Sequence, residues 1–199
     1  MVDGTRYPKV ARYLSRLEGG LDAHPSCQVK GSVLKNALDS APITLDASGL
    51  PAEIAKLLES PPLTSEWMSE VHLNAAMIAF ADSMSDGDWQ SWTYERNRAL
   101  FRTSLYRVLF FVLSPERLFV GIANRWAAFR RGTTLRLVEM KDKKARLELR
   151  YPLNLYDEST LTAMRIAFRA AADAAGAARS ASEVVETDGK HTVVDVTWD

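Results

Sequence analysis

Histidine and cysteine are the residue types that most often bind metals or attack substrates, and this chain contains few of them. The three histidines, His24, His72 and His191, form neither a His-x-x-x-His pair nor a Glu-x-x-His motif, the spacings that place two ligands on one helix face. The single cysteine, Cys27, excludes an intramolecular disulfide and a multi-cysteine metal site. His24 precedes Cys27 by three residues in an expected loop, so an ordinary thiol is favoured over a nucleophile with a poised base. The sequence predicts no metal and no cofactor.

Motifs that bind phosphates or activate a serine are also missing. No Gly-x-Gly-x-x-Gly, Gly-x-x-x-x-Gly-Lys-Ser/Thr or Gly-x-Ser-x-Gly stretch occurs. Asp82, Asp86 and Asp88 flank an expected loop between two helices and could coordinate a hard cation. Calcium loops space their ligands more densely and end on a bidentate carboxylate, so helix capping is the favoured role of these three residues. We therefore predict no catalytic residues and a protein that is not an enzyme.

Aromatic residues are concentrated between residues 67 and 129. Each buried ring removes roughly 150–250 Å² from water, so these rings must dominate the energetics of the core. At helical spacings a packed core is favoured over a cavity, but rings that line a cavity could hold an apolar ligand. On the second reading, the candidate ligand-binding residues are Trp89, Trp92, Tyr106, Phe110 and Trp126.

Charge is distributed unevenly, although 25 basic and 25 acidic residues give a net charge of zero. The segment from Arg125 to Arg150 contains nine basic and three acidic residues, whereas the following segment, residues 151–199, has more acidic than basic residues. The basic segment could pair with the acidic one in the same or a neighbouring chain, dock a protein partner, or attract nucleic acid or an anionic surface. The candidate partner-binding residues are Arg130, Arg131, Lys141, Lys143 and Lys144.

Length and composition are typical of a soluble globular protein. The chain has 199 residues, of which 47% are hydrophobic and 25% charged. This composition excludes a disordered, collagen-like or low-complexity chain and a globally basic nucleic-acid binder. The longest apolar runs, residues 75–81 and 108–113, are far shorter than the ~20 residues that span a bilayer. The first eleven residues lack the apolar region of a signal peptide, so we expect a cytoplasmic protein.

Hydrophobic periodicity predicts helices followed by strands. Helices are expected at residues 8–17, 32–38, 51–58, 64–84 and 115–131, and a further helix at 158–175. Another helix is expected to end at residue 113 and to begin at residue 89 or 94. Strands are expected at residues 134–137, 145–151, 182–186 and 191–198. The fold class is therefore α+β, with a helical layer followed by a small antiparallel sheet in hairpin–helix–hairpin order. Residues 26–199 are expected to form one domain, and residues 1–25 an ordered extension or a frayed arm.

One expected helix is too apolar for a single buried face. Residues 105–113 are apolar on nearly every side, so this segment must be covered by the central core or by a second subunit. We therefore predict a homodimer.

Several short motifs resemble an uncharacterised family of paralogues of about this length in myxobacteria. They are Val29-Lys30-Gly31-Ser32, Ser114-Pro115-Glu116-Arg117-Leu118, then Trp126 and Phe129 before Gly132, and Ala174-Ala175-Gly176. The order of helices and hairpins is similar to a ligand-binding superfamily that includes haem-NO sensors, vinyl-reductase-type domains and TRAPP trafficking subunits. The resemblance implies a cavity, lined by aromatic rings, that could hold an apolar ligand.

The chain departs from that superfamily where cofactors are held. Haem-NO sensors use a histidine ligand and a Tyr-x-Ser-x-Arg motif, whereas Ser104-Leu105-Tyr106-Arg107 has related residues in another order. Metal-binding vinyl-reductase-type domains use several cysteines, and this chain has one. The resemblance therefore implies neither haem nor zinc.

Two functions are consistent with these residues. The favoured one is a non-enzymatic sensor or adaptor domain that binds a protein partner, including its own copy, and a small apolar ligand. The alternative is a binder of nucleic acid or an anionic surface, working through the basic segment between Arg125 and Arg150.

Overall fold

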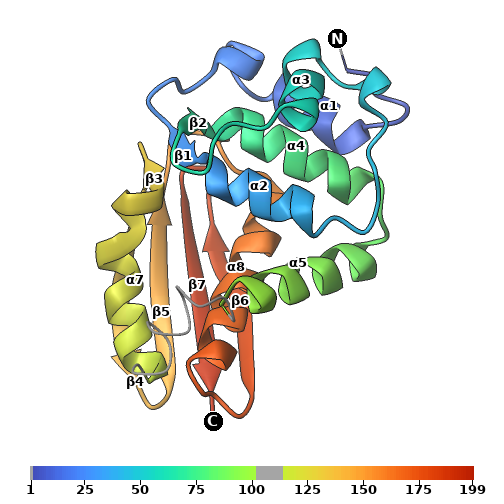
Figure 1. Cartoon of the computed structure of the whole chain (residues 1–199). Coiled ribbons are helices and arrows are strands. Elements are labelled where there is room, and N and C mark those ends of the chain that lie inside the picture. Colours follow the sequence, from blue (N-terminus) through green and yellow to red (C-terminus); the bar gives the residue numbers. More distant parts are fainter. Residues whose placement is uncertain (1, 102–113) are drawn as a thin grey trace.

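A computed structural model describes residues 2–101 and 114–199 and confirms the α+β class (Figure 1). The described helices are α1 (Pro8–Ser15), α2 (Gly31–Asp39), α3 (Ala52–Glu59), α4 (Glu70–Asp82), α5 (Asp86–Phe101), α7 (Pro115–Phe129) and α8 (Glu158–Ala174). The strands are β1 (Gln28–Lys30), β2 (Trp67–Ser69), β3 (Arg130–Arg131), β4 (Thr134–Lys141), β5 (Lys144–Arg150), β6 (Ser180–Thr187) and β7 (His191–Trp198). The hairpin β4–β5, helix α8 and hairpin β6–β7 follow one another in the expected order.

Helix α4 is the centre of the helical layer. It is buried on nearly every side, and it contacts α1, α3, α5 and α8. The sequence predicted a longer helix, over residues 64–84, with Trp67 and Met68 on its apolar face. That boundary is wrong, because Trp67–Ser69 pairs as strand β2 and the helix begins after Ser69. Ser69 Oγ accepts a hydrogen bond from the backbone N–H of His72, as expected for a residue that caps a helix.

A second sheet was not predicted from the sequence. Its three strands, in the order β2-β1-β3, are only two or three residues long and come from distant parts of the chain. Strands of this length show no alternation of apolar and polar residues that a sequence pattern could reveal.

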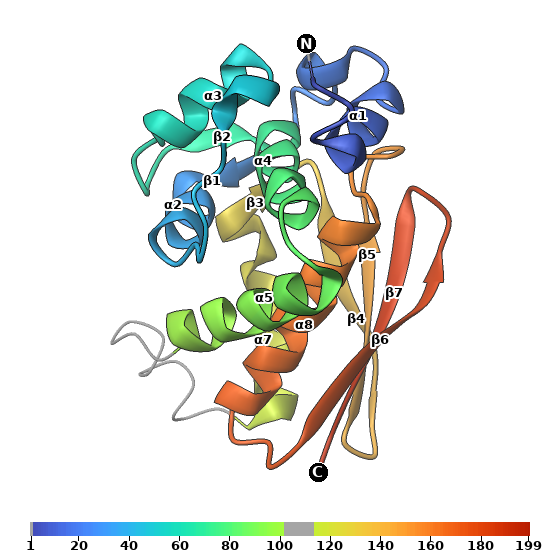
Figure 2. The ribbon, with the colours of Figure 1, turned by 90° about the vertical axis from the view of Figure 1, so that its right-hand side faces the viewer.

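The four-stranded sheet has the order β4-β5-β7-β6 and is antiparallel throughout. Alternation places Ala145, Leu147 and Leu149 of β5 on one face, where they are buried. Helices α7 and α8 cover that face, and α8 lies between the sheet and α5 (Figure 2). The opposite face carries charged side chains.

Residues 2–25 include helix α1, which takes part in the packing of the helical layer. Tyr7, Val10 and Tyr13 are at most 2% exposed, and α1 packs against α4. The division of the chain into this segment and a domain of residues 26–199 stays a prediction. Among the described helices, none is long and apolar enough to cross a membrane.

Candidate functional site

The two tryptophans of α5 are packed into the core. Trp89 and Trp92 are 3% and 8% exposed, and their ring centroids are 5.3 Å apart. Trp92 also lies 5.1 Å from the ring of Phe80 in α4, and its indole Nε1 donates a hydrogen bond to the carbonyl of Ser40 at 2.8 Å. Both its ring and its polar atom therefore have protein partners, and a role of Trp89 and Trp92 in ligand binding stays a prediction.

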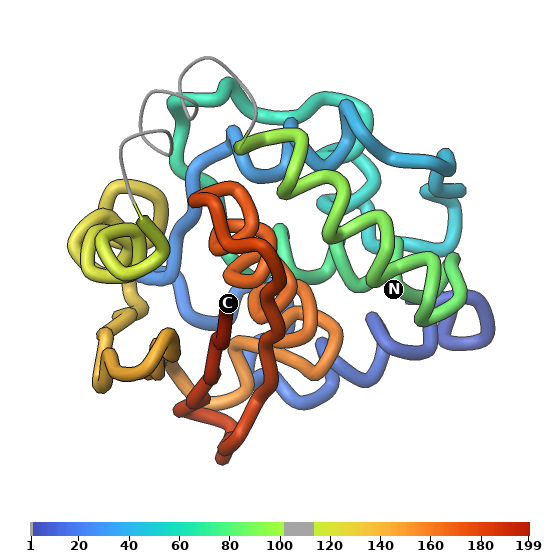
Figure 3. Tube along the Cα trace, turned by 90° about the horizontal axis from the view of Figure 1, so that it is seen from below, coloured from blue at the N-terminus to red at the C-terminus, as the bar shows by residue number. Residues whose placement is uncertain are grey.

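The other candidate ligand-binding residues do not join this pair. Tyr106 and Phe110 lie outside the described residues. Trp126 belongs to α7, and α7 and α5 lie on either side of α8 (Figure 3). The indole Nε1 of Trp126 donates to Thr133 Oγ1 at 2.9 Å. A role of these residues in ligand binding stays a prediction.

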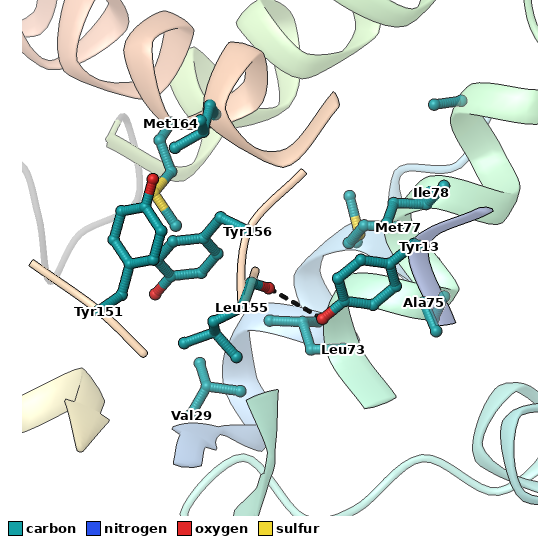
Figure 4. Close-up of a cluster of buried hydrophobic side chains, with 14 of the residues drawn as sticks. Tyr13, Val29, Leu73, Ala75, Met77, Ile78, Tyr151, Leu155, Tyr156 and Met164 are labelled. Atoms are coloured by element: carbon teal, nitrogen blue, oxygen red, sulfur yellow. Dashed lines mark hydrogen bonds between the residues drawn. The ribbon is translucent and has the colours of Figure 1, made fainter. Parts of the chain in front are cut away.

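In the core between the helical layer and the sheet, buried polar side chains form hydrogen bonds and aromatic rings contact one another. Tyr13 Oη donates to the carbonyl of Leu155 at 2.8 Å (Figure 4). The side-chain amide of Asn74 donates to the same carbonyl, also at 2.8 Å. The rings of Tyr151 and Tyr156 meet at 4.7 Å between centroids. Burial raises the pKa of Tyr13, so its hydroxyl stays protonated and able to donate.

One face of α5 differs from this pattern. Trp89, Thr93 and Arg96 follow the i, i+4, i+7 spacing that places residues on one side of a helix. Within residues 2–101 and 114–199, the indole Nε1 of Trp89 and the hydroxyl of Thr93 have no hydrogen-bond partner, although both side chains are buried. Their donor capacity is unused by the described protein atoms.

Arg96 lies on the same face, and its guanidinium is close to a thioether sulfur and an aromatic ring. One nitrogen lies 3.7 Å from the sulfur of Met77, and the guanidinium carbon lies 4.9 Å from the centroid of Trp92. No acidic partner of Arg96 occurs in the described part of the chain, and burial lowers its pKa to about 10. Thr93 and Arg96 were not predicted from the sequence, although their helical spacing from Trp89 is visible in it.

A buried ion pair joins the helical layer to the chain leaving α7. Glu70, at the start of α4, is 0% exposed and pairs with Arg130 of β3. Tyr156 Oη donates to the same carboxylate oxygen of Glu70 at 2.6 Å. Burial raises the pKa of Tyr156 to about 12, so the hydroxyl remains a donor at neutral pH. Arg130 is thus held inside the fold.

The five candidate partner-binding residues are not gathered on one surface. Arg131, beside Arg130, places its guanidinium carbon 3.9 Å from the ring centroid of Trp67. Lys141, Lys143 and Lys144 lie at the other end of β4, a strand of eight residues and hence about 25 Å long. Lys144 pairs with Asp195, whereas Lys141 and Lys143 are exposed. Partner binding by these residues stays a prediction.

The outer face of the four-stranded sheet joins the basic hairpin to the acidic one. Arg146 binds Asp195 through two hydrogen bonds of 2.7 and 2.8 Å, and these bonds lower the pKa of Asp195. This contact is the intramolecular pairing that the sequence analysis considered. An open hollow of about 450 Å³ lies on the same face, lined by three valines and by Arg146, Glu148, Glu186 and His191.

The described residues contain no cluster of three or more His, Cys, Asp or Glu side chains that could hold a metal ion. His24 Nε2 lies 3.0 Å from the carbonyl of Leu153, and His191 Nε2 lies 3.2 Å from Glu148 on the outer sheet face. The thiol of Cys27 packs 3.6 Å from the carbonyl of Gly132, and burial raises its pKa. A raised pKa disfavours the thiolate that metals bind.

Comparison with known proteins gives a likeness of fold. No protein-family model matches the chain, and no curated protein matches it. The crystal structure of an Fe(II) unliganded H-NOX protein from K. algicida superposes with a TM-score of 0.51 at 10% identity. A mutant of that protein superposes with a TM-score of 0.54 at 12% identity. Each alignment covers 85% of this chain and 96% of the other. The chain thus has an H-NOX-like fold.

Proposed function

We propose that this protein is a non-enzymatic sensor domain that binds a small organic ligand in its helical layer. The observation that carries the proposal is the extent of the H-NOX-like fold, which covers 85% of the chain. The unpartnered donors on α5 support it, because buried polar groups in folded proteins almost always have a partner.

A haem does not fit the residues of this chain. The H-NOX proteins in the comparison hold Fe(II), and haem-NO sensors bind their iron through a histidine. Here His24 contacts a loop carbonyl, His191 lies on the outer sheet face and His72 belongs to the first turn of α4. Helix α7, which precedes the first hairpin, has no histidine. The proposed ligand is therefore an organic molecule without iron.

We expect such a ligand to copurify with the protein or to stabilise it. Native mass spectrometry should find a bound organic compound, and its removal should lower the melting temperature. A ligand at 100 times its Kd stabilises a protein by about 2.7 kcal/mol, which is about 5–10 °C for a domain of this size. A protein that carries no compound, and whose melting temperature no member of a metabolite library raises, would contradict the proposal.

We also propose that the sensor signals through a protein partner and that it forms a homodimer. The support is the composition of residues 105–113, which lie outside the described residues. Sedimentation velocity of the full chain at high micromolar concentration should give a dimer. The variant Leu109→Glu should give a monomer, because a charge in an apolar interface is costly. Val138→Glu, at a valine that is 58% exposed on β4, is the matched control and should stay dimeric. A monomeric wild-type protein would exclude the dimer.

A further inference from the structure

The inner face of α5 presents hydrogen-bond donors without acceptors. Trp89 Nε1 and Thr93 Oγ1 have no partner among the described residues, although the two side chains are 3% and 0% exposed. They lie on one side of the helix with Arg96, over an axial rise of about 10 Å. An indole N–H and a guanidinium can only donate, and a hydroxyl can donate or accept. The ligand that suits this face is therefore an acceptor.

The charge of Arg96 specifies the acceptor further. Arg96 is partly buried, and a negative partner stabilises a guanidinium that has lost part of its water; none of the carboxylates in residues 2–101 and 114–199 pairs with it. The nearest acid in sequence, Glu95, pairs with Arg98 at 3.5 Å instead. Asp173, on the facing helix α8, accepts hydrogen bonds from Tyr94 and Ser180. Both acids are therefore engaged elsewhere.

The contacts of the partly buried Arg96 guanidinium are with apolar groups. It lies 3.7 Å from the sulfur of Met77 and 4.9 Å from the ring centroid of Trp92, which packs on Phe80. In such surroundings, charge-assisted hydrogen bonds are stronger than in water. We infer that the α5 face binds the anionic head group, a carboxylate or a phosphate, of a ligand whose remaining part is apolar. This inference rests on the proposed function and names the chemistry of its ligand.

Three probes with one alkyl chain test the head group: octanoate, octyl phosphate and octan-1-ol. We expect octanoate or octyl phosphate to bind the full-length protein, and octan-1-ol to bind at least about 10-fold more weakly, because it cannot pair with the guanidinium. The anion that binds more tightly identifies the head group. Equal affinities for octan-1-ol and both anions would overturn the inference while leaving the proposed function intact. If neither anion binds, the inference is also overturned, and the search for a copurified compound decides the proposed function separately.

Substitutions on α5 locate the contact. Arg96→Met should weaken binding of the anion by about 10- to 100-fold, and Thr93→Val by about 3- to 10-fold, as expected for lost hydrogen bonds to a charged and a neutral donor. Arg98→Met, which removes a partly exposed arginine of the same helix, is the matched control and should leave the affinity unchanged. Circular dichroism checks that each variant is folded. Equal effects of Arg96→Met and Arg98→Met on the affinity would show that Arg96 does not bind the head group.

The indole N–H signals in ¹H–¹⁵N NMR spectra give a readout that does not depend on the variants. The signal of Trp89 should shift on addition of the anion, because its N–H acquires an acceptor. The signals of Trp92, Trp126 and Trp198 serve as internal references, since their N–H groups already donate to Ser40, Thr133 and Glu116. A Trp89 signal that stays fixed while the anion binds would place the ligand elsewhere and overturn the inference.

Discussion

Gly132→Ala should destabilise the protein by about 2–4 kcal/mol, as measured by urea unfolding followed through tryptophan fluorescence. Gly132 has a φ of +75°, in the left-handed region that costs a residue with a Cβ about 1 kcal/mol. A Cβ at this position would also lie 2.7 Å from Cys27 Sγ and 2.8 Å from the carbonyl oxygen of Ser26. The glycine is required because the chain from β3 to β4 crosses directly over the residues that precede β1.

Gly176→Ala separates the two contributions. Gly176 ends α8 with a φ of +97°, and a Cβ there would meet nothing within 4 Å. This control should therefore lose only the conformational part, about 1 kcal/mol. Adding Cys27→Ala to Gly132→Ala should recover only part of the loss, because Ser26 contributes a backbone atom that cannot move aside. Equal losses of unfolding free energy in Gly132→Ala and Gly176→Ala would mean that the β3–β4 connection can move away from Ser26 and Cys27.

The sequence predicted well those elements whose apolar pattern is long and whose ends carry strong signals. Helix α7 begins at Pro115 after Ser114, and α8 begins after Asp157, whose carboxylate accepts from the Thr160 N–H at 2.8 Å. Asp188-Gly189 forms the turn of the last hairpin, and Gly189 has a φ of +85°. Local chemistry decides these boundaries, so local sequence reveals them.

Long-range pairing could not be predicted in the same way. Trp67 and Met68 lie at a helical spacing from Val71, but pairing with β1 holds them in a strand. The alternative, a longer α4, was favoured by helical periodicity and by Thr64 or Ser65 as a capping residue. Tertiary contacts override local preference where an element is short, and the whole three-stranded sheet falls in this class.

The candidate site shows the same division. The sequence correctly marked α5 as rich in rings, but it could not distinguish Trp92, whose N–H reaches Ser40, from Trp89, whose N–H has no partner among the described residues. Hydrogen-bond satisfaction depends on atoms of other elements. Charge counting likewise treated Arg130 and Arg131 as equal, although one pairs with a buried acid and the other stacks on an indole.

Arg130→Met is therefore expected to act on stability and not only on partner binding. The substitution would leave the carboxylate of Glu70, 0% exposed, with the Tyr156 hydroxyl at 2.6 Å as its one remaining side-chain donor within the described residues. Breaking a buried ion pair from one side costs about 3–5 kcal/mol, because the other charge remains without compensation. Urea unfolding should show this loss. Tyr156 cannot replace the arginine, since its pKa of about 12 keeps it a neutral donor.

Two further variants decide between a structural and a surface role for Arg130. Arg131→Met removes the neighbouring charge, whose ring contact is exposed, and should cost less than about 1 kcal/mol. Glu70→Gln combined with Arg130→Met should recover much of the single-variant loss, because no buried charge then remains. If Arg130→Met and Arg131→Met were equally mild, the Glu70–Arg130 pair would not be what joins the start of α4 to the strand that follows α7. Arg130 would then be free to serve a partner, as the charge pattern of the sequence first indicated.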